Sequence, residues 1–212
     1  MRQRGLPLVL KRLLDGAGAG VLLVLALPLL AVLALLVRLG SPGPAFFRQT
    51  RLGRHRRPFP CYKLRTMLHG SDEEPHRAYV AELLTGTNAR RREGLFKLAD
   101  DARITPLGRF LRATSLDELP QLWNVLRGEM SLVGPRPVVA YEVEHYRPED
   151  LERFEVLPGL TGLWQVSGRS ERSYREMLDL DLEYVRRWSP WLDLKILAAT
   201  FGTVLRGGSR AR

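Results

Sequence analysis

The longest apolar run in the chain covers residues 16–37 and contains no charged side chain. At about 1.5 Å per residue, a helix of this length extends roughly 33 Å, close to the thickness of a bilayer core. Pro28 lies near the middle of the run, where a proline removes a backbone hydrogen bond and kinks or breaks a helix. The run therefore predicts a membrane helix with a break point at Pro28, and its length argues against a cleaved signal peptide.

A second pattern lies near the middle of the sequence, where apolar residues recur at intervals of three and four and predict one helical face: Leu116, Leu119, Leu122, Trp123 and Leu126. Gly128 is placed to end that helix. Ser115 and Glu118 have the spacing of a capping box, and Pro120 offers an alternative start. With either start, Asp117 and Glu118 lie at the N-terminal end, where the helix dipole favours ionised carboxylates.

Two strands are predicted over residues 45–52 and 59–67, joined by a turn that is rich in Gly, Arg and Pro. In the second strand, Lys63 and Arg65 alternate with other residue types, so both side chains share one face. From the residues alone, that face either has a functional role or is simply solvated or turned to lipid headgroups.

Several further helices are indicated. Thr105 and Pro106 have the residue types of a helix start, and the short helix that follows has an apolar face made of Leu107, Phe110 and Leu111. Other helical segments are predicted over residues 75–84, 148–154, 174–187 and 188–205. The last is headed by tryptophan and is interrupted by Asp193 and Lys195, so it either lies in the membrane interface or packs on the domain. Together these elements predict a small α/β-type domain with a short β-hairpin, built on an N-terminal membrane helix.

The net charge of +10 raises the possibility of nucleic-acid binding. Its distribution argues against that function, because residues 1–71 hold twelve Lys and Arg against one acid, whereas residues 72–212 hold 21 against 22. The excess positive charge therefore surrounds the apolar run, and we expect no nucleic-acid partner. Cys61 is the single cysteine, which excludes an internal disulfide, and the four histidines lack the spacing of a zinc site.

Basic residues flank both ends of the apolar run, and positively charged flanks remain on the cytoplasmic side of a membrane. A re-entrant helix that turns at Pro28 keeps both flanks in the cytoplasm, whereas a spanning helix with a proline kink places one of them outside. We therefore favour a re-entrant membrane helix and basic flank over residues 1–40, followed by a cytoplasmic domain over residues 41–212. The basic flanks are also suited to anionic lipid headgroups.

The Gly-Pro-Arg-Pro sequence of residues 134–137 predicts a stiff loop, because each proline restricts the residue before it to extended conformations. Arg136 is thus held on a rigid support, and its guanidinium can bind a phosphate with two parallel hydrogen bonds. Arg112, which ends the helix before the acid pair, could reach the same anion. The alternative is that Glu118 only caps its helix and that Asp117 only balances the helix dipole.

The segment of residues 117–137, with its acid pair and its Gly-Pro-Arg-Pro loop, resembles the core signature of the bacterial sugar transferases, the monotopic polyprenyl-phosphate phosphoglycosyl transferases. The resemblance extends from Lys11 to about Leu205. It implies transfer of a sugar 1-phosphate from a UDP-sugar to a polyprenyl (undecaprenyl) phosphate on the cytoplasmic face of a bacterial membrane. In this family the reaction passes through a covalent aspartyl-phosphosugar, releases UMP and begins exopolysaccharide, O-antigen or glycoconjugate synthesis. Many members have a serine before the membrane proline, where this chain has Leu27.

The resemblance also implies roles for individual residues. Asp117 is expected to be the nucleophile and a ligand of Mg²⁺, with Glu118 as its helper, and Arg136 with Arg112 to be the anion clamp. Further residues that match motifs of the family are Lys63 and Arg65 in the second strand, Gln165 and Arg169 in a glycine-rich segment, and Asp181. From the residues alone, the glycine-rich segment is equally a packed loop with glycines at positive φ. A homo-oligomer is compatible with the sequence, and a non-catalytic scaffold would have no use for Asp117 together with Arg136.

Overall fold

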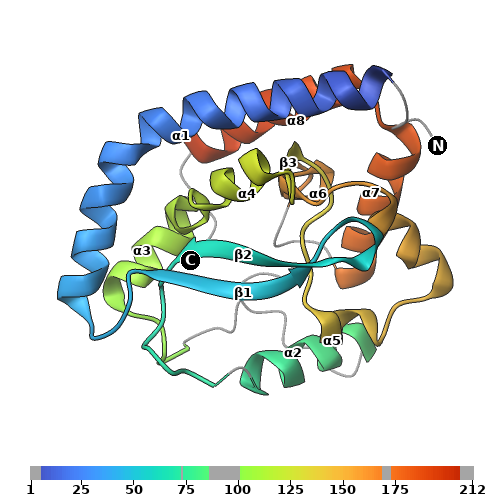
Figure 1. The fold of residues 1–212 in the computed structure, drawn as a ribbon. Coiled ribbons are helices and arrows are strands. Elements are labelled where there is room, and N and C mark those ends of the chain that lie inside the picture. Colours follow the sequence, from blue (N-terminus) through green and yellow to red (C-terminus); the bar gives the residue numbers. More distant parts are fainter. Residues whose placement is uncertain (1–5, 73, 86–100, 169–172, 206–212) are drawn as a thin grey trace.

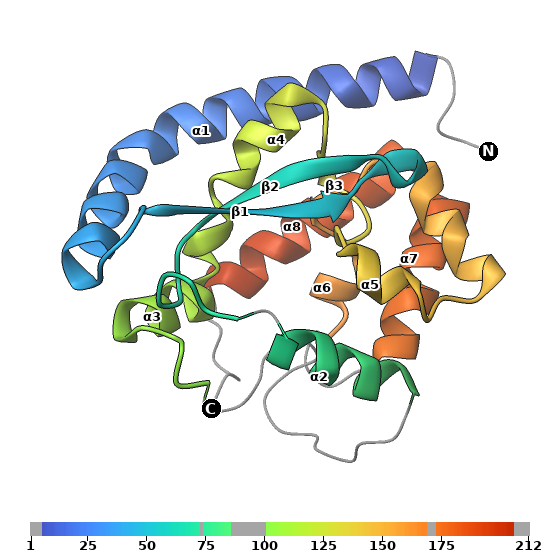
Figure 2. The same cartoon turned by 60° about the horizontal axis from the view of Figure 1, so that its bottom comes forward.

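The structure is a computed structural model, and it describes residues 6–72, 74–85, 101–168 and 173–205. The fold is mixed α/β, as predicted, with a long apolar helix that extends along one end of the molecule and α2 at the opposite end (Figures 1 and 2). The helices and strands, in chain order, are α1 (Leu6–Gly40), β1 (Phe46–Leu52), β2 (Pro58–Leu64), α2 (Glu74–Thr85), α3 (Pro106–Thr114), α4 (Gln121–Arg127), β3 (Ser131–Val133), α5 (Ala140–Val143), β4 (Gly159–Thr161), α6 (Leu163–Val166), α7 (Tyr174–Arg187) and α8 (Pro190–Leu205). Three 3-10 helices complete the described elements: η1 (Arg54–Arg56), η2 (Leu116–Glu118) and η3 (Pro148–Glu155).

β1 and β2 form the predicted antiparallel hairpin, which η1 closes. The register sets three pairs opposite one another on one face: Arg51 with Phe59, Gln49 with Cys61, and Phe47 with Lys63. Asn124 of α4 binds the outer edge of β2, because its amide nitrogen donates to the Pro60 carbonyl at 2.7 Å and its amide oxygen accepts from the Tyr62 N–H at 3.1 Å. This side chain is fully buried, so α4 is fixed against the hairpin by hydrogen bonds that replace a third strand.

Helix α1 begins ten residues before the uncharged run and continues through Pro28 without a break in its secondary structure. Figures 1 and 2 show that the helix curves strongly along its length, as expected for a helix with an internal proline. Pro28 therefore bends the helix and does not divide it into two separate arms. Within the described part of the chain, α1 is the one helix that is long and apolar enough to cross a membrane.

One side of α1 packs on the domain and the other side exposes a large apolar surface. Its buried residues join those of α3 and β2 in one cluster: Leu30, Leu33, Val37, Leu64 and Leu111. Its exposed residues include Val21, Leu22, Leu25, Val32, Leu35 and Leu36. Helix α8 likewise exposes Trp191, Leu194, Leu197 and Phe201, while Ile196 is buried in the main core. Exposed apolar areas of this size indicate an apolar environment around both helices.

Both ends of α1 are bound to the same domain. Near the N-terminal end, the Lys11 ammonium lies 2.6 Å from a carboxylate oxygen of Asp193 in α8. Near the C-terminal end, the buried Arg65 guanidinium donates to the Val37 carbonyl in the last turn of the helix and to the Ser41 and Pro42 carbonyls just after it. A helix attached at both ends to one domain cannot place those ends on opposite sides of a membrane.

Two local predictions were wrong. Ser115 does not cap a helix, because it has a left-handed backbone (φ 59°) and ends α3, while α4 starts after Pro120. The residues expected on the apolar faces also include two that point outward, Phe110 at 54% and Trp123 at 50% exposure. By contrast, the Thr105 cap, the Gly128 stop and the bounds of the helix Tyr174–Arg187 are confirmed.

We predict that the N-terminus and the hairpin turn lie on the same side of the membrane, because both ends of α1 bind one domain. Single cysteines would replace Arg4 or Arg57 in a Cys61→Ser background, and an impermeant thiol reagent would be applied to intact cells. Both cysteines should resist labelling in intact cells and react after permeabilisation. Labelling of one site but not the other in intact cells would contradict the docking of both helix ends.

Candidate functional site

The acid pair lies in η2, the turn between α3 and α4, and not in the first turn of α4. The left-handed Ser115 reverses the chain, so that Asp117 turns into the protein and is 7% exposed. The Glu118 side chain is about one third exposed and accepts a hydrogen bond from the Lys63 ammonium of β2 at 2.8 Å. The structure thus brings together Asp117, Glu118 and Lys63 from two elements distant in sequence.

The two carboxylates have opposite pKa shifts. Burial raises the pKa of Asp117 to about 6; the charge of Glu118 adds to the shift, while Lys63 and Arg112 oppose it. Burial alone would also raise the pKa of Glu118, but Lys63, Arg136 and Arg51 together hold it below its usual range. Asp117 is therefore the more basic carboxylate and the better nucleophile, whereas Glu118 stays anionic and holds Lys63 in place.

Three arginines act on the acid pair. The charge of Arg112 acts mainly on Asp117 and the charges of Arg136 and Arg51 act on Glu118, so all three guanidinium groups are within electrostatic range of the pair. Arg112 and Arg136 were predicted, and the structure brings both to the site. Arg51 was not predicted, because its position in a strand next to other basic residues gave no signal beyond positive charge.

The loop of residues 134–137 is held by its carbonyl oxygens. Within the loop, the Gly159 N–H donates to the Pro135 carbonyl, Arg153 to Arg136 and Arg51 to Pro137. Just before the loop, Tyr184 and Lys11 donate to the Val133 carbonyl. Just after it, the Leu52 N–H donates to the Val138 carbonyl. Since Pro135 and Pro137 have no N–H of their own, these carbonyl contacts supply most of the support that the loop can receive. The predicted stiffness of the loop is thus reinforced from five directions.

Three glycines let the backbones of this loop and the segment around β4 pack directly on each other. A Cβ atom on Gly134, Gly159 or Gly162 would clash with backbone atoms of the facing segment. The packed-loop alternative placed glycines at positive φ, which is found at Gly168 (φ 106°) but not at Gly159 or Gly162. At those two positions, close backbone approach is the reason for glycine. The side-chain oxygen of Gln165 lies beside Gly162, which places Gln165 next to the loop.

Asp181 lies behind the loop in a buried network. Its carboxylate pairs with Arg153 at 2.6 Å, and the same guanidinium donates to the Arg136 carbonyl at 2.8 Å and to the Tyr146 hydroxyl at 2.5 Å. The network continues through Tyr174 to Glu142. In this position Asp181 supports the loop from behind, so a direct role in substrate binding gains no support.

Two other predicted site residues are not placed at the acid pair. Arg65 donates to the carbonyls at the C-terminal end of α1, and this position does not support a role in phosphate binding. Arg169 lies outside the described residues.

A Mg²⁺ ion fits the site only together with a phosphate ligand. Within the described residues, no three His, Cys, Asp or Glu side chains gather as a ready metal cage. Mg²⁺ is commonly bound through one or two carboxylates plus substrate phosphates, and the pair Asp117 and Glu118 meets that requirement. Since Glu118 is already paired with Lys63, Asp117 has the freer carboxylate for a metal ion.

These features combine a basic, buried carboxylate with four cations in electrostatic range of the acid pair. Lys63, Arg51, Arg112 and Arg136 can neutralise the oxygens of a phosphate or diphosphate, while Asp117 can attack phosphorus. The arrangement suits phosphoryl transfer, in which catalysis depends mainly on positioning and on stabilising charge.

Comparisons with known proteins agree with this chemistry. A model of the family described as bacterial sugar transferase matches residues 6–207. The chain is 46% identical over 199 residues to a UDP-galactose-lipid carrier transferase of Erwinia amylovora, covering 93% of this chain and 40% of that protein. It is 44% identical over 203 residues to a UDP-glucose:undecaprenyl-phosphate glucose-1-phosphate transferase of Caulobacter vibrioides, covering 92% of this chain and 69% of that protein. It is 42% identical over 197 residues to the exopolysaccharide production protein ExoY of Rhizobium meliloti, covering 92% and 84%. The chain thus spans about two fifths of the Erwinia protein.

The glycine packing behind the loop generates a stability prediction. We expect Gly159→Ala to lower the free energy of unfolding by about 2–4 kcal/mol, since overpacking costs about 1–3 kcal/mol and a lost hydrogen bond about 0.5–1.5 kcal/mol. Unfolding in detergent, followed by circular dichroism, measures the loss. Gly16→Ala is the matched control, because a Cβ there meets no atom and alanine favours a helix. Equal stability of the two variants would contradict the packing argument.

Proposed function

Because this chain belongs to the bacterial sugar transferase family, we propose that it transfers a sugar 1-phosphate from a UDP-sugar to undecaprenyl phosphate. The observation that carries this proposal is the position of Asp117, which is buried beside Glu118. The charges of Lys63 and Arg112 act on Asp117, and the charge of Arg136 acts on Glu118. The printed names of the relatives supply the substrate class, and the name of the Rhizobium relative supplies a place in exopolysaccharide production.

The first half of the reaction uses Asp117 as the nucleophile. A carboxylate oxygen of Asp117 forms a bond to the β-phosphorus of the UDP-sugar, and the bond between that phosphorus and the bridging oxygen breaks. The electron pair leaves with UMP, and the sugar phosphate remains on the aspartate. Arg136 and Arg112 bind the phosphate oxygens, where charge is greatest in the transition state.

In the second half, a phosphate oxygen of undecaprenyl phosphate attacks the same phosphorus and returns the electron pair to Asp117. The products are a lipid-linked diphosphate sugar and the free carboxylate. The lowered pKa of Glu118 favours a role in orienting Lys63 over a role in carrying protons at neutral pH. A Mg²⁺ ion held by Asp117 and the diphosphate would neutralise charge on the leaving UMP.

The proposed site of action is the cytoplasmic face of a bacterial membrane. The exposed apolar sides of α1 and α8 enter the lipid, and the attachment of both ends of α1 to one domain agrees with the re-entrant topology. This orientation brings the acid pair close to the lipid surface, where the phosphate of the carrier lies. The basic residues after α1 face anionic headgroups.

The proposal predicts a covalent intermediate and ping-pong kinetics. With UDP-sugar alone, the enzyme should release one UMP per active site, and mass spectrometry should find a phosphosugar on the peptide that contains Asp117. Asp117→Asn should abolish both signals, because a neutral amide is a poor nucleophile. Glu118→Gln is the comparison variant, which should form the adduct more slowly.

Intersecting initial-rate plots, together with no adduct in the wild-type enzyme, would instead indicate direct attack by the lipid phosphate. No UMP release with any UDP-sugar, with or without the lipid acceptor, would exclude the proposed activity itself.

The raised pKa of Asp117 predicts the pH dependence of the first half-reaction. The ionised form attacks, so kcat/KM for the UDP-sugar should rise with pH, with the midpoint of the rise near pH 6. Lys63→Met removes a charge that lowers this pKa, so the rising limb should move to higher pH. Arg127→Met, an exposed charge removal on α4, should leave the limb in place. If Lys63→Met left the midpoint of the rising limb unchanged, the assignment of this limb to Asp117 would be contradicted.

A further inference from the structure

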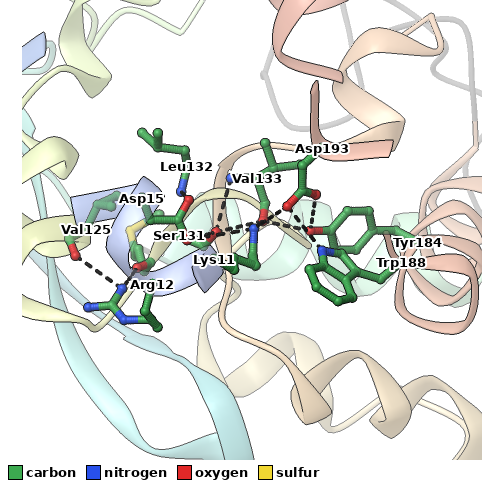
Figure 3. Close-up of polar contacts among 11 residues, drawn as sticks. Lys11, Arg12, Asp15, Val125, Ser131, Leu132, Val133, Tyr184, Trp188 and Asp193 are labelled. Carbon is green, nitrogen blue, oxygen red and sulfur yellow. Dashed lines mark hydrogen bonds and ion pairs between the residues drawn. The ribbon is translucent and has the colours of Figure 1, made fainter. Parts of the chain in front are cut away.

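A buried polar junction joins the N-terminal part of α1 to the strand that leads into the loop of residues 134–137. Figure 3 shows the Lys11 side chain pointing from α1 toward Asp193 and Val133. Lys11 is 7% exposed, and its ammonium lies 2.6 Å from a carboxylate oxygen of Asp193 and 3.2 Å from the Val133 carbonyl. Three elements therefore meet at one ammonium group: α1, β3 and α8.

Asp193 collects donors from α7 and its C-terminal end as well. The Tyr184 hydroxyl lies 2.8 Å from one carboxylate oxygen of Asp193, and the Trp188 indole N–H donates to the other at 3.1 Å. The same Tyr184 hydroxyl also lies 2.9 Å from the Val133 carbonyl. Tyr184 has one hydroxyl proton, which it shares between Asp193 and the Val133 carbonyl, so Lys11 is the charged donor to that carbonyl and Asp193 orients both side chains (Figure 3).

The next turn of α1 binds the rest of β3. The Asp15 carboxylate accepts from the Ser131 hydroxyl at 2.7 Å and from the Leu132 N–H at 3.2 Å. Arg12 donates to the Met130 carbonyl at 3.2 Å. The polar residues at this end of α1 therefore fix successive residues of the strand, and Lys11 contacts the last one before the loop.

Stability alone is a weak explanation for this junction. A buried ion pair often contributes little net stability, because removing two charges from water is expensive. Lysine on a lipid-facing helix would normally extend its ammonium to the membrane surface, yet this ammonium turns into the domain. What the junction does supply is a fixed position for the Val133 carbonyl, one residue before Gly134 and three before Arg136.

We propose that Lys11 and Asp193 are positioning residues, through which docking of α1 and α8 sets the loop that carries Arg136. The role rests on the proposed function, because Arg136 must reach a phosphate at the acid pair. In this arrangement, the membrane helices are part of the catalytic framework as well as the anchor. A loop released at Val133 would keep its proline stiffness but lose its register against Asp117.

The test compares removal of one charge with removal of both. Lys11→Met leaves the Asp193 carboxylate buried without its cation, which destabilises the protein. Lys11→Met/Asp193→Asn removes that unpaired charge, while the buried Asp15, 3.7 Å from Lys11, keeps its hydrogen bonds from Ser131 and the Leu132 N–H. Unfolding in detergent should therefore return most of the way to wild type. Neither variant restores the hydrogen bond from Lys11 to the Val133 carbonyl, which then depends on the Tyr184 and Ser131 hydroxyls. Lys11→Arg keeps the charge and the donors, and Arg38→Met removes an exposed charge from the same helix as the control.

Two readouts are needed for each variant. One is kcat/KM for the UDP-sugar, measured by UMP release, and the other is hydrogen–deuterium exchange of the peptide over residues 131–139. The folded double variant should lose about tenfold to a hundredfold in kcat/KM, as for a misplaced binding group, and should exchange faster in this peptide. Lys11→Arg should recover most of the activity, and Arg38→Met should match wild type in both readouts.

The proposal is overturned if the double variant regains wild-type kcat/KM, since the pair would then act only through stability. Unchanged exchange over residues 131–139 in the double variant overturns it as well. Exchange does not depend on turnover. A wild-type protein that releases no UMP would therefore defeat the proposed function, while the exchange result would still decide whether Lys11 and Asp193 hold the loop.

Discussion

The loop between β3 and α5 is held in place mainly through its carbonyl oxygens, because its two prolines have no N–H to donate. The hairpin supplies Arg51 and the Leu52 N–H, and β4 supplies the Gly159 N–H. The other donors are Arg153 of η3, Tyr184 of α7 and Lys11 of α1. The direction of the Arg136 side chain follows from this support. Long-range contacts from five elements converge on this short segment, so its geometry depends on how those elements pack.

The electrostatics of the site follow from placing that loop against the turn η2. Burial raises the pKa of Asp117, and the surrounding cations keep Glu118 ionised, so two adjacent carboxylates differ in basicity. A buried basic carboxylate is suited to attack on phosphorus, and fixed guanidinium groups are suited to the charge that develops there. The attachment of α1 and α8 at β3 connects this chemistry to the surface on which a lipid phosphate would be presented.

The sequence predicted the parts whose signals are local. Proline, threonine and glycine at helix ends located α3 and the end of α4, and period-two alternation located the hairpin. The motif located Asp117, Glu118 and Arg136. It could not reveal Arg51, Asn124 or Arg153, because their partners are distant in sequence. Arg51, for example, binds Pro137, which is 86 positions away. The same holds for Lys11, which binds Val133 at 122 positions. Such pairings depend on the packed fold, and nothing in the neighbouring residues indicates them.

The central claim is that the loop exists to fix one guanidinium against a phosphate, and Arg136→Lys tests it most directly. A lysine keeps the charge but cannot make two parallel hydrogen bonds. Because a charge-assisted bond contributes about 1.5–3 kcal/mol, kcat/KM for the UDP-sugar should fall by about tenfold or more, with unfolding in detergent unchanged. Arg127→Lys, an exposed arginine of α4, should have no effect on kcat/KM. Near-wild-type turnover by a folded Arg136→Lys enzyme would contradict the account.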